Sequence, residues 1–145
     1  MPANLQQDPV LYGECLSGAL YTNDFFSIAR EIGFYQPVYV RGRPLSIQNS
    51  AIAEKVKHYR FDSRTYRLYR SGSLEASEED YGQAVMLSSA VDEEVVFEFA
   101  EKLEFHLGKV TPVSRNLFNI LYQSRFRPYF RFFGEGTTHY GPFVN

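Results

Sequence analysis

The side chain with the most distinctive chemistry in this sequence is its single cysteine, Cys15. A thiolate is a nucleophile and a ligand for soft ions, and the positive end of a helix favours that form. Cys15 belongs to the run GECLSGAL at 13–20, near the start of a predicted helix. From the residues alone, a buried and unreactive cysteine packed by its small neighbours is favoured over this activated thiol. One cysteine also excludes an intrachain disulfide and a site of four thiolates.

Other patterns of catalytic or metal-binding residues are not found. His58, His106 and His139 stand far apart in the sequence, so a metal site would require the fold to bring them together. The acidic run at 78–80 falls in a predicted loop, where solvated charge is the ordinary explanation. The sequence contains no GxGxxG, GxSxG, HExxH or CxxC pattern. We therefore expect no cofactor, no metal and no catalytic residue.

Composition places the chain among folded proteins. It has 145 residues, of which 44% are hydrophobic and 17% aromatic, enough for one domain with its own core. The net charge of -2 argues against nucleic-acid binding. The run RFRPYFRFF at 125–133 could stack bases, but the same alternation is typical of a half-buried strand, which we favour. Without an 18-residue apolar stretch or a signal-like N-terminus, we expect a cytoplasmic protein that does not bind membranes.

Helices and strands must position these residues, and the patterns predict both. The region 11–33 is expected to be helical, as two helices or one bent helix, the region 37–133 rich in sheet, and 134–145 a glycine-rich tail. Asn49 or Ser50 is expected to cap one short helix, and Ser114 another that runs to Ser124. Strands are predicted at 37–47, 60–70, 83–90 and 129–133, and a loop at 71–80. We predict a single α+β domain over 1–145, with a mainly antiparallel β-sheet flanked by helices.

The strongest alternation in the sequence predicts one long strand from Val95 to Leu107. Its apolar side chains share one parity and its polar side chains the other, so that one face enters the core. Glu101 falls on the apolar parity. Either a β-bulge at Glu101 or a carboxylate directed into a pocket would explain it, and the bulge is favoured.

Blocks spread in order along the chain resemble the arsenite S-adenosylmethionine methyltransferase family. The first is GECLSGALY at 13–21, which is similar to the segment that carries an arsenic-binding cysteine in that family. The others are RF at 60–61 with TYRL at 65–68, EDYGQ at 79–83, GKV at 108–110, SRF at 124–126 and HYG at 139–141. The resemblance covers the C-terminal, arsenic-binding half of the family alone, in which several thiolates hold trivalent arsenic.

Departures from the family pattern affect its thiols and histidines. Tyr59, Glu78 and Asn145 stand where relatives carry cysteines. Ala100, Lys102 and Leu103 stand where relatives carry an acid and paired histidines. Cys15 is the member of the thiol set that remains, so the resemblance implies that arsenic binding is lost or weakened.

We expect from this resemblance a noncatalytic binding or accessory domain, able to hold a small thiol-reactive or apolar ligand. An alternative is one subunit of a split S-adenosylmethionine-dependent methyltransferase whose cofactor-binding chain is separate. The helix after Cys15 would then present Phe25 and Phe26 to a partner, or otherwise to a second copy in a homodimer. The candidate ligand-binding residues are Cys15, Glu14, Tyr59, Tyr66, Tyr81, Phe97 and Glu101.

Overall fold

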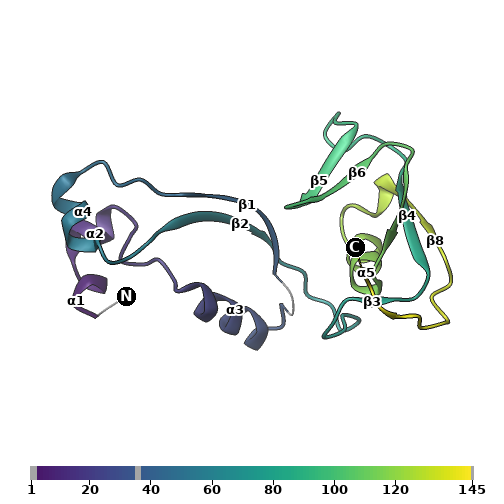
Figure 1. Cartoon of the computed structure of the whole chain (residues 1–145), viewed down its shortest axis with the longest axis horizontal. Coiled ribbons are helices and arrows are strands. Elements are labelled where there is room, and N and C mark those ends of the chain that lie inside the picture. The colour runs from purple at the N-terminus through teal and green to yellow at the C-terminus, as the bar shows by residue number, and fades with distance from the viewer. Residues whose placement is uncertain (1–2, 35–36, 145) are drawn as a thin grey trace.

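The computed structural model describes residues 3–34 and 37–144, and in it the chain forms an elongated molecule (Figure 1). We call residues 3–67 the N-terminal lobe and residues 68–144 the C-terminal lobe. The N-terminal lobe contains α1 (Ala3–Gln6), α2 (Pro9–Gly13), α3 (Thr22–Glu31), β1 (Val38–Pro44), α4 (Ser50–Val56) and β2 (Asp62–Arg67). The C-terminal lobe contains β3 (Glu79–Asp80), β4 (Gln83–Leu87), β5 (Val96–Ala100), β6 (Leu103–His106), β7 (Val110–Val113), α5 (Arg115–Gln123), a 3-10 turn (Arg127–Tyr129), β8 (Phe130–Phe133) and β9 (Gly141–Pro142).

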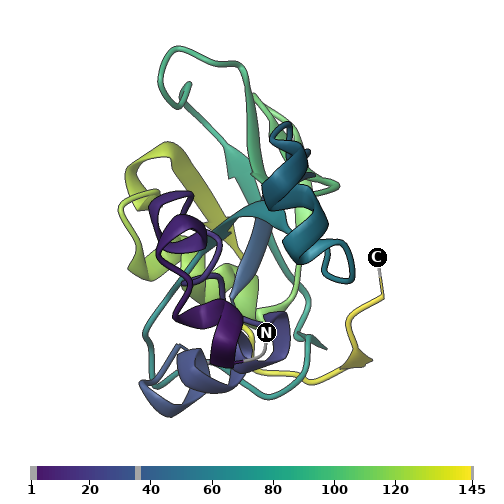
Figure 2. The same ribbon diagram turned by 90° about the vertical axis from the view of Figure 1, so that its left-hand side faces the viewer.

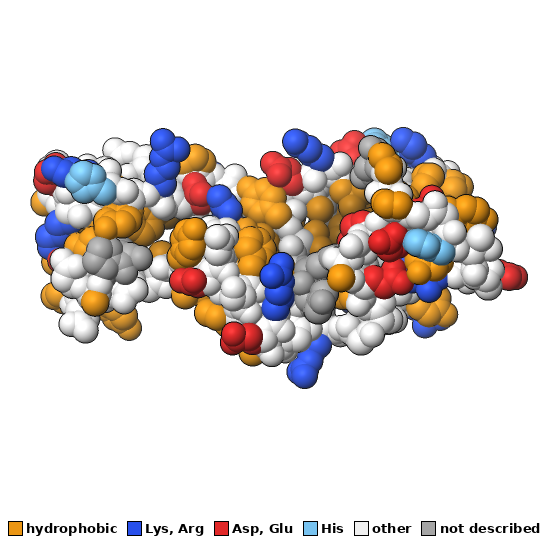
Figure 3. Space-filling view, turned by 60° about the horizontal axis from the view of Figure 1, so that its bottom comes forward, with side chains coloured by type: hydrophobic (Ala, Val, Ile, Leu, Met, Phe, Trp, Pro, Cys, Tyr) orange, Lys and Arg blue, Asp and Glu red, His pale blue; other side chains and the backbone are white. Residues whose placement is uncertain are grey.

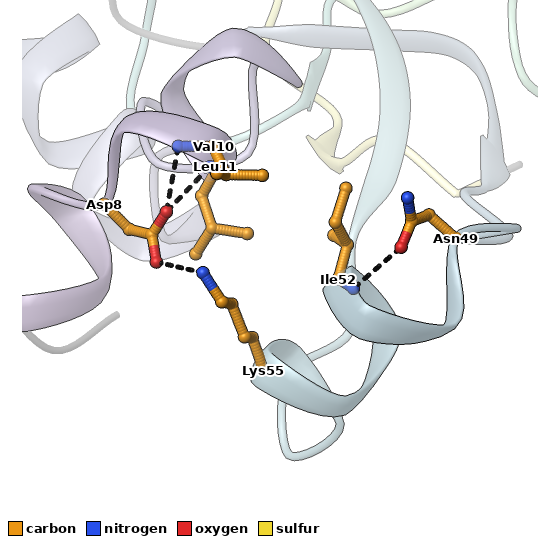
Figure 4. Close-up of polar contacts among 6 residues, drawn as sticks. All are labelled: Asp8, Val10, Leu11, Asn49, Ile52 and Lys55. Atoms are coloured by element: carbon orange, nitrogen blue, oxygen red, sulfur yellow. Dashed lines mark hydrogen bonds and ion pairs between the residues drawn. The ribbon is translucent and has the colours of Figure 1, made fainter.

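Short capped helices form the outer end of the N-terminal lobe, which faces the viewer in Figure 2. The Asp8 carboxylate caps α2 by accepting hydrogen bonds from the Val10 and Leu11 amides, and it pairs with Lys55 of α4 at 2.6 Å (Figure 4). The hydrogen bond from Lys55, followed by that from the Leu11 amide, holds the pKa of Asp8 below its ordinary value. Asn49 caps α4 in the same way, as the sequence predicts. The two helices are therefore fastened to each other by one carboxylate.

An antiparallel ribbon of β1 and β2 leads from these helices toward the C-terminal lobe (Figure 1). Helix α3 packs on this ribbon through Phe25 and Phe26, whose rings lie 5.0 and 5.7 Å from that of Tyr66. Both phenylalanines are partly buried. Tyr66 therefore covers part of both rings, and the prediction that they face a partner chain or a second copy stays a prediction.

The C-terminal lobe is built on small antiparallel sheets. β4 lies between β7 and β8, while β5 pairs with β6 and β3 with β9. The rings of Phe97, Phe99, Phe105, Phe126 and Phe130 fill the core that these elements enclose. The segment at 125–133 contributes the rings of Phe126 and Phe130, but the prediction of a strand over the whole segment is wrong, because the 3-10 turn Arg127–Tyr129 precedes β8.

The predicted long strand is instead a hairpin of β5 and β6. The chain reverses at Glu101 and Lys102, where Lys102 has a φ of +63°. The arms pair Phe97 with Phe105, so residues of one parity face the same side in both arms, and alternation alone cannot distinguish a hairpin from one strand. Glu101 is exposed at this turn, and the irregularity in the ladder falls between Glu98 and Ala100. Both explanations offered for Glu101 are therefore wrong.

Two hydrophobic clusters hold the molecule together, one in each lobe. The smaller cluster contains Leu11, Leu16, Ile52 and Val56. The larger belongs to the C-terminal lobe, and Val38 of β1 packs against it. Arg67 of β2 also reaches that lobe, donating a 3.0 Å hydrogen bond to the Phe99 carbonyl and lying 5.5 Å from the Phe97 ring centre.

The fold class is α+β with small antiparallel sheets, as predicted from the sequence. The predicted boundary of a single domain over 1–145 stays a prediction. Within residues 3–34 and 37–144, no helix is long and apolar enough to cross a membrane.

Candidate functional site

A pocket of about 330 Å³ opens in the N-terminal lobe between the start of α3 and the strand β2. We call it the tyrosine pocket, because three of its lining side chains are tyrosines. Its lining residues come from two segments, 19–25 and 59–66: Ala19, Leu20, Tyr21, Thr22 and Phe25 from the first, and Tyr59, Arg60, Phe61, Asp62, Arg64 and Tyr66 from the second. Its volume is in the range of small-molecule sites.

The aromatic wall of the tyrosine pocket is held by ring contacts around Tyr66. Phe25 lies 5.0 Å from the Tyr66 ring, and Tyr39 lies 5.6 Å from it on the other strand. These rings fix the position of Tyr66 on β2, and they leave its hydroxyl near Arg64. The wall is therefore an ordered apolar surface with polar groups at its rim.

At the rim of the tyrosine pocket, the Arg64 side chain is held by two polar contacts. Its guanidinium donates to the Tyr66 hydroxyl at 3.5 Å and pairs with Asp62 at 2.7 Å. The contact with the Tyr66 hydroxyl, and next that with Asp62, raise the pKa of Arg64 above its ordinary value. Arg60 adds a second cation to the lining.

Cys15 precedes the first pocket segment and lies in the turn that ends α2. The Leu16 amide donates to the Leu11 carbonyl at 2.9 Å, and the Cys15 amide to the Tyr12 carbonyl at 3.0 Å. These two bonds define a Schellman motif, with Cys15 at the position where glycine is usual. Cys15 has a φ of +60°, which costs a non-glycine residue about 1 kcal/mol or more. The chain thus holds its one thiol, which is exposed, in a strained turn.

Cys15 follows a helix end, so the prediction that it lies near a helix start is wrong. The small residues after it, which suggested a packed thiol, form part of the turn between α2 and α3. The alternative of a buried, packed cysteine is also wrong, because the thiol is exposed. Its neighbour Glu14 is the exposed C-cap residue of α2.

The other predicted ligand-binding residues are only partly brought together. Tyr59 and Tyr66 line the tyrosine pocket. Tyr81 belongs to the C-terminal lobe, where Arg115 covers its ring at 3.4 Å and its hydroxyl donates to Glu75. That bond to Glu75, and next its burial, raise the pKa of Tyr81. Phe97 is a core residue and Glu101 an exposed turn residue, so neither contributes to the pocket.

Four lining residues were not predicted from the sequence: Phe25, Arg60, Asp62 and Arg64. A signal for part of this set was present, because 60, 62, 64 and 66 share one parity within the predicted strand at 60–70. In β2, that parity places the side chains of 62, 64 and 66 on one face. Nothing in the sequence indicated that α3 would cover that face.

Two of the three histidines have an acidic partner in the structure. His106 pairs with Glu104 at 2.9 Å and His139 with Glu79 at 2.9 Å. No group of three or more His, Cys, Asp or Glu side chains is placed to hold a metal ion in the part of the chain that the structure describes.

Comparisons with known proteins point to one family. No family model matches the chain. It is 45% identical over 140 residues to an arsenite methyltransferase of Aquipseudomonas alcaligenes, covering 96% of this chain and 40% of that protein. An arsenite methyltransferase of Mus musculus is 30% identical over 135 residues, covering 91% of this chain and 35% of the relative. A crystal structure of an arsenic(III) S-adenosylmethionine methyltransferase from Chlamydomonas reinhardtii superposes with a TM-score of 0.87 at 33% identity, covering 99% of this chain and 48% of that one.

The chain is homologous to arsenite methyltransferases. It spans about two fifths of the length of the curated relatives it matches, consistent with a C-terminal region of them.

The residues that depart from the family pattern lie in different surroundings. Tyr59 lines the tyrosine pocket, Glu78 and Leu103 line a second cavity, Ala100 is buried in the core, and Lys102 lies at the hairpin turn. Asn145 lies outside the described residues.

Proposed function

We propose that this chain is a noncatalytic ligand-binding or accessory domain, and that its tyrosine pocket holds a small thiol-reactive or apolar molecule. The observation that carries the proposal is an open, aromatic pocket. The exposed thiol of Cys15 is not among its lining side chains but lies four residues before Ala19 in the sequence. The exposure of the Cys15 thiol supports a role in binding, because a ligand can reach it.

The chemistry of the pocket favours an apolar body with one reactive centre. Aromatic walls take up apolar groups, and the arginines at the rim orient a ligand that carries an acceptor atom. A thiolate is a soft ligand and suits trivalent arsenic. Dimethylarsinous acid fits this description because it can form one As–S bond. Its As–O bond breaks in that step, and the hydroxyl leaves as water with the thiol proton.

The test is a titration of the 145-residue chain with dimethylarsinous acid, with adducts counted by intact mass. The native protein should form one adduct, while Cys15→Ser and Cys15→Gly should form none. Cys15→Gly should also be more stable by about 1 kcal/mol, because glycine adopts the left-handed turn without strain. Loss of the adduct in a more stable variant cannot come from unfolding. Equal adduct formation by native protein and Cys15→Ser would remove Cys15 from the proposal.

The contribution of the tyrosine pocket needs its own variant. Tyr59→Ala should speed release of the arsenical about tenfold, since it removes a lining ring. Tyr140→Ala removes an exposed ring of the C-terminal lobe and should leave release unchanged. Identical release from native protein and Tyr59→Ala would exclude the pocket.

A second candidate function is one subunit of a split methyltransferase. Exposed apolar side chains at Tyr12, Leu20 and Ile32 support it, because a separate cofactor-binding chain could cover them. Mixing the chain with a separately expressed cofactor-binding domain of a relative should then give a complex and methyl transfer to arsenite. Absence of a complex by size-exclusion chromatography would count against this function.

A further inference from the structure

We infer that a second cavity, in the C-terminal lobe, binds a small organic amine whose ammonium group pairs with Glu78. We call it the C-terminal cavity. Its volume is about 220 Å³, and Phe99, Leu103, Leu117 and Ile120 form much of its wall. It shares no residue with the tyrosine pocket, so this inference goes beyond the proposed function.

The walls of the C-terminal cavity come from several parts of the fold. The hairpin β5–β6 and helix α5 provide much of the apolar surface, and Val38 of β1, Pro112 of β7 and Phe143 near the C-terminus complete it. An engineered apolar cavity of about 150 Å³ stays dry and binds benzene. The present cavity can therefore hold one ring with a short substituent.

Two polar side chains, Glu78 and Ser114, interrupt this apolar lining. The Ser114 hydroxyl donates to Glu78 Oε2, and Asn116 Nδ2 donates to Glu78 Oε1 at 3.3 Å. Ser114 and Asn116 are themselves almost completely buried at the start of α5. The carboxylate of Glu78 is thus held in place at the cavity by two neutral donors.

Glu78 is an exposed residue and has no ion-pair partner within the described part of the chain. Among the side chains of residues 3–34 and 37–144, no Lys, Arg or His lies within ion-pair distance of it, whereas the neighbouring Glu79 pairs with His139. A carboxylate has lone pairs beyond the two that Ser114 and Asn116 use, so it can accept further hydrogen bonds. Its charge and the apolar walls together select a cation with an apolar body.

The inference is tested with benzylamine and benzyl alcohol, which have the same shape and differ in charge. Amide chemical shifts of the chain are followed in both titrations. Benzylamine should bind about tenfold more tightly than benzyl alcohol, with shifts in the cavity residues of β5, β6 and α5. Glu78→Gln should abolish this preference, while Glu79→Gln, the matched control outside the cavity, should keep it.

A second variant separates the cavity from the charge. Leu103→Phe should narrow the cavity and weaken both ligands by a similar factor. The inference is overturned if the two ligands bind the native protein equally, if Glu78→Gln keeps the preference, or if the shifts map to the tyrosine pocket. Absence of saturable benzylamine binding up to about 10 mM also overturns it.

Discussion

In the N-terminal lobe, Asp8 is the clearest case of a single residue that stabilises more than one helix. Its carboxylate caps α2 and binds Lys55 of α4, so it stabilises two helices at once (Figure 4). These contacts lower the pKa of Asp8 in the folded state. A lowered folded-state pKa means that the stabilisation is complete above the unfolded-state value and is lost as the pH falls through the folded-state value.

Substitution of Asp8 therefore gives a pH-dependent prediction. Asp8→Asn retains a capping oxygen but loses the charge that faces Lys55, and should lower Tm by a few degrees at pH 7. The difference from the native protein should begin to shrink as the pH falls through the unfolded-state pKa of about 4, and should disappear below the lower folded-state pKa, where the native carboxylate is protonated. Thermal unfolding measured from pH 7 to pH 3 checks this. Glu135→Gln, at an exposed position, is the control, and a difference constant across the range would contradict the prediction.

Among the elements, α5 organises the loop that precedes β3, and Asn116 is the link between them. Its Oδ1 accepts from the Glu75 amide at 2.7 Å, and its Nδ2 donates to the carbonyls of Glu75 and Ser77. Asn116→Ala removes a buried side chain and leaves these part-buried backbone groups without its hydrogen bonds, so it should lower the free energy of unfolding by about 2–3 kcal/mol. Hydrogen exchange at 75–78 should increase as well.

Asn119 supplies the matched control for Asn116 on the same helix. It donates one exposed hydrogen bond, to the Ser73 carbonyl at 3.2 Å. Asn119→Ala should therefore cost less than about 1 kcal/mol. Equal losses in the two variants would mean that burial of Asn116 does not determine its effect.

Short-range sequence patterns predicted the helix caps, whereas they did not predict where the chain reverses direction. The caps Asn49 and Ser114 were predicted because a capping side chain bonds to amides two or three residues ahead. The turn at Glu101 and Lys102 was missed because neither residue is typical of a position with positive φ. The turn at Cys15 was missed for the same reason, since a glycine is expected there. Tyr59 and Tyr66 were predicted as site residues, but their partner wall on α3 depends on tertiary packing.

At the scale of the whole molecule, apolar side chains remain exposed on the N-terminal lobe. Figure 3 shows hydrophobic patches over this lobe, interrupted by charged side chains. Ile28 of α3 is 44% exposed and Ile32, directly after the helix, is 56% exposed. Four residues apart, they lie on one side of the helix, next to Phe25, which is three residues before Ile28 and packs on Tyr66. A lobe whose own core holds so few side chains gains stability if this face is covered.

We expect a second copy of the chain to cover this face in a two-fold dimer, because a self-complementary patch closes without leaving a free edge. Light scattering at micromolar concentrations should give twice the mass of the 16.8 kDa chain. The double variant Ile28→Lys and Ile32→Lys should be monomeric, since it places like charges opposite each other across the axis. Val110→Lys, at an exposed apolar position of the C-terminal lobe, should leave the dimer intact. A native protein that stays monomeric across this range would leave the face open for a different chain, as the split-methyltransferase function requires.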